Sequence, residues 1–68
     1  MSDDRQALQT LARRWRWEDE HDKRLDTHLI AWQAVIVARR IYCRARSPLG
    51  RSLAYQELNL WKERLLER

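Results

Sequence analysis

The sequence predicts an all-α protein of three helices, in which a central apolar helix lies between two flanking helices. Three observations support this fold class. One glycine and one proline in 68 residues are too few for the turns of a many-stranded fold. Apolar residues recur at three- and four-residue spacing near both ends of the chain. Residues 29–38 carry no charge, which is typical of a helix that is buried on most sides.

The length allows a single domain, residues 1–68, with a small core. A domain of this size buries only about 60% of the surface that its unfolded chain exposes. Disulfides, a structural metal or association usually supply the missing stability. Cys43 is the only cysteine, and together with two histidines it falls short of a zinc site. We therefore expect a helical homodimer that holds no metal and no cofactor.

Two features of the sequence bear on its location. Two of the first four residues, Asp3 and Asp4, are acidic, whereas a secretory signal begins with a basic region. The apolar run 29–38 is about half as long as a helix that crosses a bilayer. We therefore expect a cytoplasmic protein without a membrane partner. Arginine supplies nearly all of the 14 basic residues, which indicates GC-rich coding and, on that ground, a bacterial or phage origin.

The first helix is predicted over about residues 3–19. Ser2 is a suitable N-cap, and the two acids that follow it favour the positive end of the helix dipole. The buried stripe expected of this helix consists of Leu8, Leu11, Ala12 and Trp15.

Trp17 does not belong to this stripe, because it lies about 200° around the helix from Trp15. Two interpretations are open: Trp17 covers a neighbouring helix, or it is an exposed anchor of a protein interface. Its neighbours on that side include basic residues that suit a binding surface, namely Arg13, Arg14, His21 and Arg24.

Residues 18–26 form a polar segment of five acids and two bases. Nothing in it forces a helix to stop, so a single helix could continue to Arg46. A break is favoured, because Glu18 and Asp22 interrupt the heptad pattern and Asp26 or Thr27 could cap a new helix.

The second helix is predicted over about residues 27–46 and is apolar nearly all round. Ile30, Val37 and Ile41 form one stripe, and Val35, Ala38 and Tyr42 form another. Residues 35–37 could also form a strand, but no partner strand is present. The remaining stripe is the expected dimer interface, because two short helices cannot cover so much apolar surface; it consists of Leu25, Leu29, Trp32, Ile36 and Cys43.

A turn is predicted at residues 47–50, Ser-Pro-Leu-Gly, where Gly50 permits a left-handed conformation. A third helix follows over about residues 51–67, capped by Ser47 or Ser52. Its expected buried stripe is Ala54, Leu58, Trp61 and Leu65, and its other face, which includes Arg64, is predicted to be solvated.

Charge is segregated along the chain, because no acid occurs between Asp26 and Glu57. Five arginines lie in that window, namely Arg39, Arg40, Arg44, Arg46 and Arg51. If the central helices of two chains crossed antiparallel near Trp32, residue n of one chain would face residue 64 − n of the other. Glu20 would then meet Arg44, and Glu18 would meet Arg46 of the other chain. Both charged blocks could equally be solvated surfaces.

Nucleic acid is the alternative partner for these arginines. These arginines, together with Tyr42, could contact the phosphates along a nucleic-acid backbone, and the pI near 10.0 is consistent with this role. Two helices joined by residues 47–50 resemble a helix-turn-helix in outline only. The first turns of the third helix offer Leu53, Ala54 and Tyr55 where polar side chains should contact bases, and Arg51 is the only suitable one.

The function that the sequence favours is protein–protein interaction, by a regulator, inhibitor or adaptor that docks on another protein. No Ser-His-Asp or Cys-His arrangement has local support, so we expect neither an enzyme nor a small-molecule substrate. Two groups of residues are expected to touch the partner: Trp17 with its basic neighbours, and the five arginines around Tyr42. Aromatic and arginine residues are enriched in the cores of such interfaces.

Overall fold

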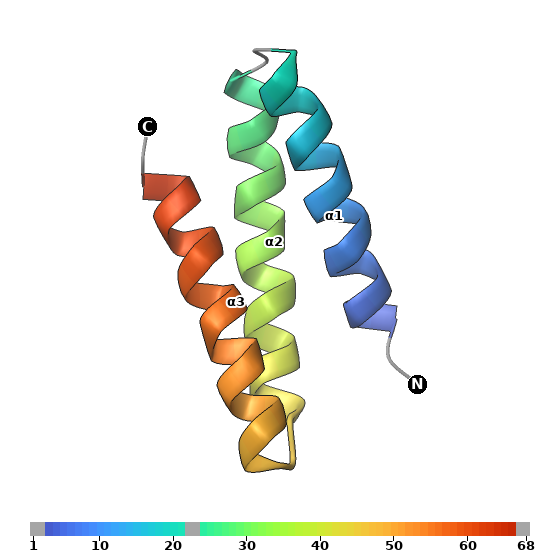
Figure 1. Ribbon diagram of the computed structural model, residues 1–68, viewed down its shortest axis with the longest axis vertical. Coiled ribbons are helices and arrows are strands. Elements are labelled where there is room, and N and C mark those ends of the chain that lie inside the picture. The colour runs from blue at the N-terminus through green and yellow to red at the C-terminus, as the bar shows by residue number, and fades with distance from the viewer. Residues whose placement is uncertain (1–2, 22–23, 67–68) are drawn as a thin grey trace.

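The computed structural model describes residues 3–21 and 24–66. They form three α-helices: α1 (Asp3–Glu20), α2 (Arg24–Arg44) and α3 (Pro48–Leu66). The helices run up, down and up, and α2 lies in the middle with α1 on one side and α3 on the other (Figure 1). The prediction of an all-α protein with a central helix is therefore confirmed. Residues 35–37, for which a strand was the alternative, are helical.

The chain does break between the first two helices. At the end of α1, the backbone N–H of His21 donates to the carbonyl groups of Trp17 and Glu18, each at 3.2 Å. Residues 22 and 23 lie outside the described part of the chain. Because α2 begins at Arg24, the predicted caps Asp26 and Thr27 are wrong. Asp26 instead lies in the first turn of α2, where a carboxylate favours the helix dipole.

The connection between α2 and α3 consists of residues 45–47, so it ends earlier than the predicted turn 47–50. Pro48 starts α3 because proline suits the first position of a helix, where no N–H partner is needed. The Ser47 hydroxyl accepts a hydrogen bond from the N–H of Gly50 at 3.0 Å. Ser47 is therefore the N-cap, and Gly50 is a helical residue rather than a left-handed one.

The core lies along α2, on the side that carries Ile30, Val37 and Ala38. Val35, Ile41 and Tyr42, the other members of two predicted stripes, are half-buried. Ala31, Ala34 and Ala38 are almost fully buried, and their small side chains let the flanking helices approach closely. The expected stripes of α1 and α3 also face this core. Its buried members are Leu8, Leu11, Ile30, Ala31, Ala34, Val37, Ala38, Leu58 and Trp61.

One cluster joins α1 to α3 across α2. Trp61 is the largest fully buried side chain among the described residues, and it forms a T-shaped pair with Trp15 at a centroid distance of 6.1 Å. The Arg64 guanidinium lies over both rings, 4.2 Å from the centroid of Trp15 and 4.6 Å from that of Trp61. Arg64 is therefore a packing residue of the core margin, and its prediction as part of a solvated surface is wrong.

The molecule measures 37 × 23 × 14 Å along its principal axes. The shortest extent is about three times the width of roughly 4.6 Å that the Cα atoms of one helix span. α1 and α3 therefore do not lie in one plane with α2, and Trp15 of α1 meets Trp61 of α3. The side of α2 that faces away from this contact is open.

Candidate interaction surfaces

The open side of α2 carries the stripe that the sequence predicts as a dimer interface. Leu29, Trp32 and Ile36 are 52%, 56% and 46% exposed, and Cys43 is also exposed. We call Leu29, Trp32 and Ile36 the α2 face. The fifth predicted member, Leu25, has its side chain outside the described residues. The flanking helices thus leave this surface uncovered, while the homodimer stays a prediction.

A hollow of about 470 Å³ opens beside the α2 face, between α1 and α2. Ile36 belongs both to the α2 face and to this hollow, so the two are continuous. Its lining is mostly apolar, with three polar members, Thr10, Gln33 and Arg40. The hollow is large enough to take a side chain of a second molecule.

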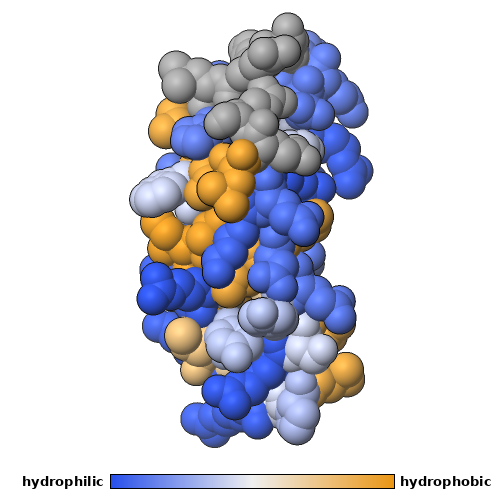
Figure 2. Space-filling model, turned by 90° about the vertical axis from the view of Figure 1, so that its left-hand side faces the viewer, coloured by the Kyte–Doolittle hydropathy of each residue, from blue (hydrophilic) through white to orange (hydrophobic). Residues whose placement is uncertain are grey.

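The α3 side of the molecule shows hydrophobic patches among hydrophilic side chains (Figure 2). Leu49, Leu53 and Leu60 are exposed, and their spacing places them on one side of α3. Leu53 also lines a groove of about 250 Å³ between α1 and α3. This volume is below the roughly 300 Å³ at which small-molecule sites begin. The sequence did not indicate this stripe, because Leu49 was assigned to a turn.

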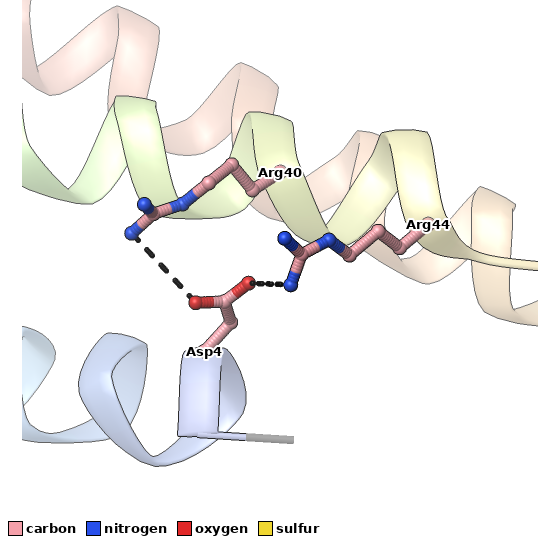
Figure 3. A network of polar contacts seen from close by, with 3 residues as sticks. All are labelled: Asp4, Arg40 and Arg44. Atoms are coloured by element: carbon pink, nitrogen blue, oxygen red, sulfur yellow. Dashed lines mark hydrogen bonds and ion pairs between the residues drawn. The ribbon is translucent and has the colours of Figure 1, made fainter. Parts of the chain in front are cut away.

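Two of the five arginines that the sequence assigns to a partner have an acidic neighbour within the chain. Asp4 Oδ2 accepts from Arg44 Nη1 at 3.4 Å, and Asp4 Oδ1 lies 3.7 Å from Arg40 Nη2 (Figure 3). Arg40 and Arg44 are thus partly neutralised within the chain, because α1 and α2 run antiparallel and the start of α1 lies beside the end of α2. Their contact with a partner stays a prediction.

The other three, Arg39, Arg46 and Arg51, are exposed, and they make no ion pair with the acids that the structure describes. The antiparallel pairing of Glu18 and Glu20 with a second chain is not tested by a single chain. Arg44, the proposed partner of Glu20, already has Asp4 beside it.

Tyr42 does not lie alone among these arginines. Its ring contacts that of Tyr55 from α3, with centroids 5.9 Å apart and planes inclined by 47°. The Arg51 guanidinium lies 5.6 Å from the centroid of Tyr42. These residues line an open hollow of about 580 Å³, together with Arg46, Pro48 and Ser52. Tyr55 was missed as a site residue, because only the pairing of α2 with α3 places it beside Tyr42.

Trp17 lies at the end of α1 and is 48% exposed, so it is not buried beneath a neighbouring helix. The His21 ring stacks on the Trp17 ring at a centroid distance of 3.9 Å, with an interplanar angle of 18°. His21 Nδ1 also donates to the Trp17 carbonyl oxygen at 2.8 Å. His21 thus supports the end of α1 and also widens the aromatic surface of Trp17.

The two groups of predicted partner-binding residues do not form one surface. Trp17 and His21 lie where α1 leads into α2, and the arginines around Tyr42 lie where α2 leads into α3, at the opposite end of the molecule (Figure 1). Arg13 and Arg14 are exposed on α1, whereas the side chain of Arg24 lies outside the described residues.

The resemblance of α2 and α3 to a helix-turn-helix does not extend to its geometry. The two helices run side by side in opposite directions (Figure 1), whereas the helices of a DNA-binding helix-turn-helix cross at about 90–120°. Ala54 in the first turns of α3 is buried against the rest of the chain. The start of α3 is thus not presented as a recognition helix.

Among the described residues, no group of three His, Cys, Asp or Glu side chains lies close enough to hold a metal ion. None of the three helices, over the residues described, is apolar over the length needed to cross a bilayer.

Comparison with known proteins found no relative. The chain matches no protein-family model, and no curated protein or solved structure is significantly similar to it.

Proposed function

We propose that the protein acts by protein–protein interaction, as a regulator, inhibitor or adaptor, and that its first partner is a second copy of itself. The observation that carries this proposal is the exposed α2 face of Leu29, Trp32 and Ile36. Large apolar side chains that gather on the surface of a soluble domain usually mark an interface. Tryptophan is also among the residues that contribute most to binding energy when an interface buries it.

The size of the chain supports a second copy as the occupant. A domain of 68 residues buries only about 60% of the surface that its unfolded chain exposes, and association is a usual source of the missing stability. A second chain on the α2 face would remove from water the apolar surface that α1 and α3 leave open.

The spacing of the α2 face fits a two-fold interface. Leu29 and Ile36 lie three and four residues from Trp32 in opposite directions along α2. Two α2 helices that cross antiparallel at Trp32 therefore place Leu29 of one chain beside Ile36 of the other. A two-fold interface must be complementary to itself in this way.

The ends of the molecule remain free in such a dimer and would dock the regulated protein. The Trp17–His21 stack supports this role at one end, because it combines a half-exposed aromatic pair with Arg13 and Arg14 one turn away. Aromatic and arginine side chains are enriched in interface cores.

Sedimentation equilibrium at micromolar concentration tests the dimer. We expect a mass of twice the 8.4 kDa of one chain. Trp32→Asp should give a monomer with an unchanged helical circular dichroism spectrum, because Trp32 is 56% exposed within the single chain. Leu49→Asp introduces the same charge at an exposed residue of α3 and should stay dimeric. A wild-type monomer, or a Trp32→Asp variant that remains dimeric, would refute the proposal.

Docking of a further protein is tested by affinity capture from a lysate of the source cell, with and without nuclease treatment. We expect a captured protein to be retained by wild type and lost with Trp17→Ser, which leaves the α2 face intact. Loss of every partner on nuclease treatment would count against protein docking.

A further inference from the structure

The hollow between Tyr42 and Tyr55 combines two features that a ligand could use together. One feature is aromatic: the two rings come from α2 and α3 and meet at a centroid distance of 5.9 Å. Tyr55 is half exposed, so part of its ring remains open to a ligand. The other feature is cationic, since Arg46 and Arg51 line the same hollow of about 580 Å³. We call these four side chains the Tyr–Arg site.

The charge around this hollow is positive, and no acidic residue whose side chain the structure describes lines it. Arg46 and Arg51 make no ion pair with the acids that the structure describes, and neither does Arg39, one turn before Tyr42 on α2. Asp4, the acid drawn in Figure 3, is already engaged by Arg40 and Arg44. A ligand that brings negative charge would meet unpaired guanidinium groups here.

We infer that the Tyr–Arg site binds single-stranded nucleic acid. Unpaired bases stack on aromatic side chains, and guanidinium groups bind the phosphates on either side of a stacked base. In this arrangement a base lies on the exposed part of the tyrosine pair, while Arg46 and Arg51 contact the adjacent phosphates. This activity lies on a different surface from the α2 face and does not depend on the dimer.

Duplex nucleic acid fits the same surface less well. A base inside a duplex is stacked on its neighbours, so the tyrosine rings cannot reach its face. Reading a duplex by its major groove would require a projecting helix, and α3 lies antiparallel against α2 with Ala54 buried (Figure 1). An acidic protein could pair with the arginines but would not need an aromatic pair. The tyrosine pair is therefore the feature that favours a single strand over a duplex and over an acidic protein.

Fluorescence anisotropy with labelled 12-nucleotide oligo(dT) and oligo(U), and with a 12-base-pair duplex, tests the inference. We expect both single strands to bind more tightly than the duplex at low salt, with an affinity that falls as salt rises. Replacing Arg46 and Arg51 together by Gln should reduce the slope of log K against log salt by about 1.4, since each phosphate contact to a single strand contributes about 0.7. Replacing Arg14 and Arg16 by Gln makes the same charge change on α1 and should leave the slope unchanged.

The tyrosines supply the second arm of the test. Tyr55→Leu should weaken binding of oligo(dT) about tenfold, because it removes one stacking surface. Tyr55→Phe keeps the ring and should bind as wild type does. Circular dichroism verifies that each variant is folded, and Tyr55 is exposed enough for both to be tolerated.

Four results would overturn the inference. They are no binding of single strands at low salt, tighter binding of the duplex, equal losses in the Arg46/Arg51 and Arg14/Arg16 pairs, and a Tyr55→Leu variant that binds as well as Tyr55→Phe does. The last two results would show that nucleic acid is attracted by the net charge of the protein and not bound at the Tyr–Arg site.

Discussion

Arg44 Nη1 lies 3.4 Å from Asp4 Oδ2, although the two residues are 40 positions apart in the sequence. The contact holds the start of α1 against the last turn of α2, and Arg40 approaches the other oxygen of the same carboxylate at 3.7 Å (Figure 3). It also removes part of the positive charge from the end of the molecule that carries the Tyr–Arg site. One acid thus influences both the stability of the hairpin and the affinity for anions.

Asp4→Asn should lower the melting temperature only slightly. Exposed ion pairs contribute less than about 1 kcal/mol, and the guanidinium side chains here are 54% and 77% exposed. In a domain of this size 1 kcal/mol corresponds to about 4–8 °C. The same variant should bind oligo(dT) more tightly than wild type, because Arg40 and Arg44 are released.

Glu63→Gln is the matched control for this prediction, because it removes one negative charge from an exposed position of α3 far from Asp4 in the sequence. An equal gain of oligo(dT) affinity in both variants would show that net charge alone is responsible. A melting temperature lowered by more than about 8 °C would show that the ion pair contributes more than an exposed one does.

Ser47→Ala should destabilise the protein by about 1 kcal/mol in urea unfolding, which is typical for loss of an N-cap. The hydroxyl accepts from the N–H of Gly50 at 3.0 Å, and the variant leaves that donor without its partner. Ser52→Ala is the control, since Ser52 lies inside α3 and is exposed. If Ser52→Ala lowered stability more than Ser47→Ala, the assigned cap would be wrong.

Trp61→Ala should leave the protein largely unfolded at room temperature. Removing a fully buried tryptophan costs about 3–5 kcal/mol. Trp61 is 1% exposed, and the total stability of so short a chain is of the same order. Trp17→Ala removes an equally large side chain that is 48% exposed and should cost about 1 kcal/mol or less. Thermal melts followed by circular dichroism compare the two, and similar losses would contradict the burial of Trp61.

The helical stripes are the part of this structure that follows from the sequence. Leu8 and Leu11 on α1, and Leu58 and Trp61 on α3, are buried as their spacing predicts. Such a pattern is local, because residues three or four apart share a face of any helix. The ends of α3 were less predictable, since Pro48 and Gly50 can serve either a turn or the first turn of a helix.

The stripe of α2 that the sequence assigns to an interface is also the exposed one, although spacing gives no physical reason for that choice. Spacing alone makes Leu29, Trp32 and Ile36 as suitable for the core as Ile30, Ala34 and Val37. The second set is buried, and the first is exposed. The choice depends on which sides of α2 the flanking helices occupy, and that is a property of the packed chain.

The sequence by itself thus determined three helices, their buried faces on α1 and α3, and the concentration of arginine near residues 39–51. Only the tertiary structure decided which arginines have an acidic partner within the chain and which tyrosines meet, and it shows why the stripe that the sequence assigns to an interface stays open: α1 and α3 occupy the other sides of α2. Each of these depends on contacts between residues far apart in the chain, such as Asp4 with Arg44 and Tyr42 with Tyr55. Periodicity specifies the side of a helix on which a residue lies, whereas a partner on another helix is set by how the helices pack.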